Sequence, residues 1–156
     1  METNKVMDLC MLGMATEGAG DVEGAKRLFQ QAWEAREDDF DACVGAHYLA
    51  RHALTVEARV QWNERALQHA DAVRDDRVTS FYPSLYLNLA TSYEELVQAE
   101  TDYNDVRRAR EYFAKALERA GDLPAGGYAD MVRTGANAGL RRADALLQAA
   151  GDQGAD

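Results

Sequence analysis

The stretch AKRLFQQA, residues 25–32, arranges two alanines around a phenylalanine with the spacing Ala-x3-Phe-x2-Ala. The same spacing returns in the stretch AREYFAKA, residues 109–116. Steps of three and four residues place these side chains on one face of an α-helix. The alanines let a second helix approach closely, and the phenylalanine fills the space between the two helices. Both stretches are therefore predicted to be helices that pack tightly against a neighbour.

A second pattern describes the helices that accompany these stretches. It has a glycine or alanine after an apolar residue, and usually a threonine or tyrosine three positions later. Its copies are Leu9-x2-Leu12-Gly13-x2-Thr16, Asp41-x2-Val44-Gly45-x2-Tyr48 and Tyr86-x2-Leu89-Ala90-x2-Tyr93. Between the first copy and residues 25–32, Gly20 breaks the helix and Asp21 can cap the next one. Two helices joined by a glycine turn form a helical hairpin, so the fold class is predicted to be all-α.

The two patterns in this order resemble the tetratricopeptide repeat family, over roughly four fifths of the chain. The resemblance implies antiparallel helical hairpins stacked as a right-handed superhelix, in a single domain over residues 1–150. The expected repeats are residues 3–38, 39–75 and 79–120. A capping helix is expected over residues 124–149, with Gly135 and Gly139 facing a neighbouring helix, and a disordered tail over residues 151–156.

The second helix of the second repeat fits two registers. Ala58-x3-Trp62 matches the alanine–aromatic spacing in one register. In the other, Ala66 follows Ala32 by 34 residues, which is the length of one repeat. The pattern alone leaves both registers open.

The third repeat is stretched relative to the first. Ala90 and Ala109 are 19 residues apart, whereas Gly13 and Ala25 are 12 residues apart. The difference corresponds to about two helical turns. The fourth and fifth helices of the chain are therefore expected to be longer than the family norm.

Composition excludes several classes of protein. The hydrophobic fraction of 47% is too high for a disordered chain, and the net charge of −10 disfavours nucleic acid and anionic membranes as partners. No run approaches the roughly 18 apolar residues of a membrane span, so a cytoplasmic location is expected. The two cysteines, Cys10 and Cys43, lie in predicted helices and are expected to be reduced core thiols.

No motif for catalysis, a cofactor or a metal stands out. The glycines are assigned to predicted helices and the turns between them, and they do not form a phosphate loop. No metal-binding or nucleophile motif is present. His47 and His52 are five residues apart, which does not place both on one helical face, and His69 lies on another helix. We expect a protein that is not an enzyme and that carries no cofactor and no metal.

Two polar groups have both a binding and a structural interpretation. His47 and Arg51 share a helical face and could present a cationic pair to an acidic partner, or Arg51 could pair with an acid of this chain. In the segment 80–90, Ser84 and Asn88 share one helical face and Tyr82 and Tyr86 another. These residues form either the polar floor of a groove, together with a tyrosine hydroxyl, or a tyrosine core with a hydrogen-bond network.

The family resemblance implies that the first helix of each repeat lines a concave groove. The predicted groove residues are Met14, Glu17, His47, Tyr48, Arg51, Tyr82, Ser84, Tyr86, Asn88 and Thr91. A carboxylate clamp of the chaperone-adaptor type is not expected, because the positions of its lysines and asparagines are apolar or uncharged here. Those positions are Cys10, Met14, Leu87 and Thr91.

Two functions are compatible with such a groove. The first is a protein–protein interaction module or scaffold that binds a peptide or helix, similar to small stand-alone bacterial tetratricopeptide proteins. The alternative is a sensor of a small ligand or signal peptide, with a pocket near Tyr82, Tyr86 and Asn88. A homodimer closed by the face of the last helix is left open.

Overall fold

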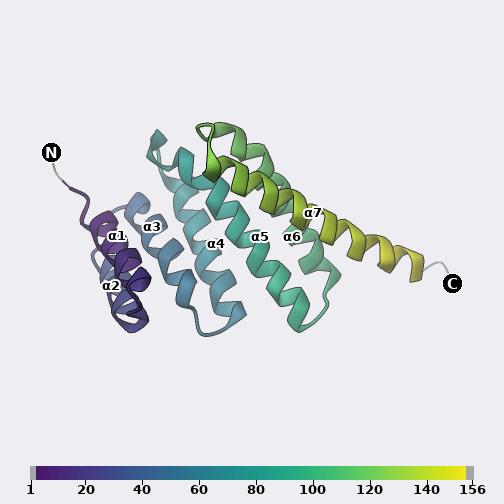
Figure 1. The fold of residues 1–156 in the computed structure, drawn as a ribbon, viewed down its shortest axis with the longest axis horizontal. Helices are drawn as coiled ribbons and strands as arrows, with labels where there is room; N and C mark the ends of the chain where they lie inside the picture. Colours follow the sequence, from purple (N-terminus) through teal and green to yellow (C-terminus); the bar gives the residue numbers. More distant parts are fainter. Residues whose placement is uncertain (1–2, 154–156) are drawn as a thin grey trace. The chain divides into compact units, whose positions relative to one another are not determined.

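A computed structural model describes residues 3–153 of the chain. Within these residues the only regular secondary structure is helical, with seven α-helices and no strand (Figure 1), which confirms the predicted all-α class. The α-helices are α1 (Lys5–Gly18), α2 (Val22–Glu34), α3 (Asp39–Leu49), α4 (Val56–Ala72), α5 (Tyr82–Ala99), α6 (Tyr103–Arg119) and α7 (Gly127–Gln153). Short 3₁₀ helices are η1 (Ala50–His52), η2 (Asp76–Phe81) and η3 (Ala120–Asp122).

The chain divides into two compact units after Val78. Unit 1 contains α1 to α4, in which α1 packs on α2 and α3 packs on α4. Unit 2 contains α5, α6 and α7, which lie side by side in Figure 1. The division falls between the predicted second and third repeats. A single domain over residues 1–150 and the right-handed superhelix stay predictions, and each unit is described by itself.

Side-chain caps fix where most helices begin. The first turn of a helix has backbone N–H groups without helical partners, and a preceding polar side chain accepts a hydrogen bond from one of them. The capping residues are Asn4 for α1, Asp21 for α2, Asp38 for α3, Thr55 for α4 and Asp102 for α6. Helix α5 begins differently, with Pro83 in its first turn, where a missing N–H costs nothing.

In each unit a buried phenylalanine packs onto a glycine of a facing helix. In unit 1 the ring of Phe29 lies against Gly13, and in unit 2 the ring of Phe113 lies against Gly139. Both rings are almost completely buried, and a Cβ atom added to either glycine would overlap the ring. The predicted close approach at Gly139 is therefore confirmed, whereas Gly135 has room because the nearest atom to an added Cβ is a methyl of Leu87 at 3.6 Å.

Burial selects one of the two registers of α4. Ala66 is fully buried, whereas Ala58 and Trp62 are only half-buried. The register that places Ala66 one repeat after Ala32 is therefore the one that faces the core. In this register Asn63 occupies the position of Phe29, and it is 3% exposed.

The fourth and fifth helices are longer than the two helices of the first repeat, and α4 has 17 residues. Helices α5 and α6 have 18 and 17 residues, and α1 and α2 have 14 and 13.

The last helix differs from its prediction at both ends. It begins at Gly127, after Gly126 adopts a φ of 156°, and continues through Gln153. The predicted disorder is therefore wrong for residues 151–153, because Ala149 and Ala150 favour helix and Gly151 continues it. Residues 154–156 of the predicted tail lie outside the described residues.

The two glycines of α7 give a matched test of this packing. We expect Gly139→Ala to lower the free energy of unfolding by about 1–2 kcal/mol, because overlap with Phe113 outweighs the gain in helix propensity. Gly135→Ala is expected to raise it by up to about 1 kcal/mol, since its new methyl group meets only ordinary contacts. Urea unfolding followed by circular dichroism measures both. Equal effects from the two variants would contradict the packing of Phe113 on Gly139.

Candidate functional site

The ten predicted groove residues are shared between the two units. Unit 1 contains Met14, Glu17, His47, Tyr48 and Arg51. Unit 2 contains Tyr82, Ser84, Tyr86, Asn88 and Thr91. Each set forms its own arrangement, and the two are considered in turn.

In unit 1, the carboxylate of Glu17, near the end of α1, contacts the side chains of Arg51 and His52. Its carboxylate accepts a hydrogen bond from Arg51 Nη2 at 2.5 Å and lies 2.6 Å from His52 Nε2. Both hydrogen bonds lower the pKa of Glu17, and the one from Arg51 contributes more than the one from His52. Glu17 therefore connects α1 to η1, and the structural interpretation of Arg51 is confirmed.

His47 does not supply the cationic partner that the sequence suggested. Burial, reinforced by the charge of Arg51, lowers its pKa to about 4, so the imidazole is neutral at pH 7. Its ring lies edge-on against Tyr48, with centroids 5.2 Å apart, and Tyr48 stacks on Phe29 at 5.4 Å. The lowered pKa disfavours a cationic His47–Arg51 pair, and His47 joins the aromatic contacts between α2 and α3.

The two cysteines are core residues. Cys10 and Cys43 are both completely buried and free, and burial is the main reason that the pKa of each thiol rises to about 12. The family resemblance placed Cys10 at a groove position, but the structure places it in the interior. Met14, one helical turn further along α1, is half-buried.

In unit 2, four tyrosines form a stacked row between α5 and α6. The ring centroids of neighbouring tyrosines are 5.7 Å apart for Tyr82–Tyr86, 6.1 Å for Tyr86–Tyr112 and 5.9 Å for Tyr112–Tyr93. Cations of α6 lie over the rings, with Arg119 at 4.4 Å from the Tyr82 centroid. Aromatic pairs of this geometry are each worth about 0.5–1.5 kcal/mol beyond the area they bury. The structure therefore shows the tyrosine part of the structural interpretation, while the hydrogen-bond network stays a prediction.

The remaining predicted residues of α5 lie on the opposite side of this helix. Ser84 is two residues from both Tyr82 and Tyr86, and two helical steps rotate a side chain by about 200°. Asn88 and Thr91 follow Ser84 at i+4 and i+7 and share its face, which we call the α5 polar face. The structure thus separates Ser84 and Asn88 from the rings of Tyr82 and Tyr86, and a groove floor formed by Ser84, Asn88 and a tyrosine hydroxyl stays a prediction.

Helix α7 runs beside the α5 polar face. Leu87 packs against a buried cluster that includes Val132 and Ala136 of α7. Glu94 accepts two hydrogen bonds from Arg142, at 2.8 and 2.9 Å. Thr91 is exposed, and its hydroxyl donates to the carbonyl of Leu87 within the same helix at 2.9 Å. Thr91 therefore lies at the surface next to a wall formed by another helix.

A hollow of about 390 Å³ lies further along these helices. It is lined by Glu94, Val97, Gln98, Arg142, Ala145 and Leu146. None of the residues Tyr82, Tyr86 and Asn88, which the sensor hypothesis requires, is in this lining. The hollow thus gives no support to a small-ligand pocket near those residues.

Sequence reasoning missed an aromatic cluster in unit 1. Trp33 of α2 meets Trp62 of α4 edge-to-face, with ring centroids 5.1 Å apart. Arg36 and Arg65 lie over these rings. A signal was available, because each of the two tryptophans in the chain is followed three residues later by an arginine.

Comparison with known proteins gives no indication of function, so the evidence for function comes from the fold and these sites. No family model, no curated protein and no solved structure matches the chain. Across the residues that the structure describes, no group of three histidine, cysteine or acidic side chains could hold a metal ion. None of the described helices combines the length and apolar character needed to cross a bilayer.

The Glu17 anchor predicts a pH-dependent stability. Because folding lowers the pKa of Glu17 below its ordinary 4.5, its contribution is present above that pH and is lost as the pH falls further. We expect Glu17→Gln to reduce the free energy of unfolding by up to about 1 kcal/mol at pH 7. The difference from wild type should shrink between pH 5 and pH 3, as melting curves would show. Glu57→Gln, at an exposed site of α4, is the control; a pH-independent loss in Glu17→Gln would contradict the anchor.

The tyrosine row predicts a strong effect at its centre. Tyr112→Ala removes two ring contacts and should lower the free energy of unfolding by about 2–3 kcal/mol, measured by urea unfolding. Tyr112→Phe keeps the ring and should cost about 1 kcal/mol or less. Tyr103→Ala, at the exposed start of α6, should change stability by less than about 0.5 kcal/mol. Similar losses for Tyr112→Ala and Tyr103→Ala would show that the row contributes little.

Proposed function

We propose that the chain is a tetratricopeptide-like interaction module that holds a peptide or helix of a partner protein against the α5 polar face. The observation that carries the proposal is the arrangement of α5 itself. One side of the helix is fixed to α6 by the tyrosine row, and the other side presents Ser84, Asn88 and Thr91. A rigid element that displays small hydrogen-bonding side chains is suited to binding a peptide.

Helix α7 supports this proposal by giving the α5 polar face a wall. A peptide lying along α5 would contact α7 on the side where Arg142 is paired with Glu94. Binding along a groove between helices is a common way of recognising an extended or helical peptide. In unit 1, Glu17, Arg51 and His47 serve the packing of the fold, so the proposal assigns them a supporting role.

The proposal includes the expected location and partner type. The partner is a protein or peptide in the cytoplasm of a bacterium, and neither nucleic acid nor a membrane is the ligand. The net charge of −10 supports the exclusion of polyanionic ligands.

Site-specific photocrosslinking tests the proposed face. A photoreactive phenylalanine analogue at Thr91 should capture a discrete partner in cells, whereas the same group at Glu118, an exposed residue of α6, should not. With the captured partner purified, Thr91→Arg should weaken its binding by at least about tenfold, because a long charged side chain blocks the face.

Three outcomes would contradict this function. Equal capture from Thr91 and Glu118 would mean that contact is not specific to the α5 polar face. A partner that binds wild type and Thr91→Arg with the same affinity would place its site elsewhere. Recovery of a small molecule alone in native mass spectrometry, with its binding lost in Asn88→Ala, would favour the sensor function instead.

A further inference from the structure

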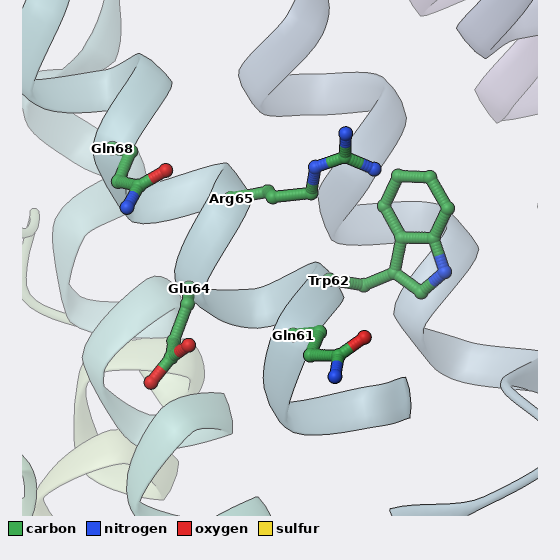
Figure 2. Close-up of a pocket in the computed structure, with 5 residues that line it drawn as sticks. All are labelled: Gln61, Trp62, Glu64, Arg65 and Gln68. Atoms are coloured by element: carbon green, nitrogen blue, oxygen red, sulfur yellow. The ribbon is translucent and has the colours of Figure 1, made fainter. Parts of the chain in front are cut away.

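The aromatic cluster of unit 1 lies at a surface. Trp33 and Trp62 are half-buried, and the arginines that accompany them are exposed. A hollow of about 370 Å³ adjoins the cluster and is lined by Gln61, Trp62, Glu64, Arg65 and Gln68 (Figure 2). In Figure 2 the side chain of Arg65 extends toward the indole of Trp62.

Both arginines rest on indole rings. The guanidinium carbon of Arg36 lies 3.8 Å from the Trp33 centroid. That of Arg65 lies 4.9 Å from the Trp62 centroid and 5.6 Å from the Trp33 centroid. Two positive charges are therefore gathered around one ring, on a protein whose net charge is −10.

These arginines differ from other arginines of unit 1 in their partners. Arg51 pairs with Glu17, and Arg77 pairs with Asp75. Within the described part of the chain, no carboxylate forms an ion pair with Arg36 or Arg65, and one N–H of Arg36 donates to the carbonyl of Trp33 at 2.6 Å. A guanidinium that lies over an aromatic ring still has N–H groups in its plane that can donate to a carboxylate.

We propose that Trp33, Trp62, Arg36 and Arg65 form a second binding site, which takes a short acidic segment of a partner protein. The arginines accept one or two carboxylates, and an apolar side chain next to those carboxylates packs on the indole edges. Gln61 and Gln68 supply amide groups that can hydrogen-bond the peptide backbone. This site is formed by α2 and α4 of unit 1 and goes beyond the function proposed for α5.

The charge of the protein favours a short acidic segment over a long one. The net charge of −10 acts against any polyanion, including a long acidic run. Screening confines this effect to about 10 Å at ordinary ionic strength, so a segment with two carboxylates is governed by the nearby arginines. A single-stranded nucleic acid, which also uses aromatic and arginine contacts, carries a charge on every nucleotide and is disfavoured.

The site contains its own probe, because Trp33 and Trp62 are the only tryptophans in the chain. We would titrate the protein with the peptide acetyl-Gly-Glu-Leu-Glu-Leu-Gly-amide, which does not absorb where tryptophan is excited. A saturable change in tryptophan emission is expected, and it should weaken as salt is added. The matched peptide with glutamine in place of both glutamates should bind at least about tenfold more weakly.

Substitutions identify the residues responsible. The variant Arg36→Gln/Arg65→Gln should lose at least about tenfold in affinity, and Arg36→Lys/Arg65→Lys should lose less, because lysine keeps the charge without the planar fork. Arg74→Gln, an exposed arginine beyond the end of α4, should bind as wild type does. The single substitutions keep the test decisive if the double variant loses helicity.

Several results would overturn the proposal. These are no saturable binding of the glutamate peptide up to millimolar concentration, equal binding of the glutamine peptide, and an equal loss in Arg74→Gln. Tighter binding of an eight-residue oligothymidylate than of the glutamate peptide would assign the site to nucleic acid. Because photocapture from Thr91 reports on a different face, it should be unchanged in Arg36→Gln/Arg65→Gln, so the two proposals can fail independently.

Discussion

A phenylalanine ring packed onto a glycine is the contact on which each unit depends. Phe29 rests on Gly13 and Phe113 rests on Gly139, and no larger side chain fits opposite either ring. In unit 2 the close approach lets Ala116 of α6 pack in one buried cluster with Ala129 and Ala136 of α7. Such packing buries apolar surface that short helices cannot bury alone. In unit 2 the same approach sets the position of α7, and with it the wall beside the α5 polar face.

The helices could be predicted because their signals are local and repeated. Small and aromatic residues at helical spacing, together with capping residues such as Asp21, determine where a helix forms and which face is buried. The sequence pattern did not determine the register of α4, because Asn63 occupies the position at which α2 and α6 have phenylalanine. The end of α7 differs from the prediction because Gly151 does not adopt a positive φ, so the helix continues through it.

The candidate sites were harder to predict, since they depend on which helices become neighbours. The tyrosines of α5 could be seen to share a face, but their stacking partner Tyr112 comes from another helix. Glu17 meets Arg51 and His52 only after α1 and η1 are brought together. Trp33 and Trp62 are 29 residues apart and occupy different positions in their repeats, so a comparison of repeats does not align them.

The burial of both thiols in unit 1 has a practical meaning for the dynamics of the protein. Cys10 and Cys43 react with a labelling reagent only when the helices around them separate, because the folded state shields each sulfur and keeps it protonated. The rate of thiol modification therefore reports how often unit 1 opens. Unit 2 has no cysteine, so one introduced at its surface would be a unique attachment point for a dye or spin label.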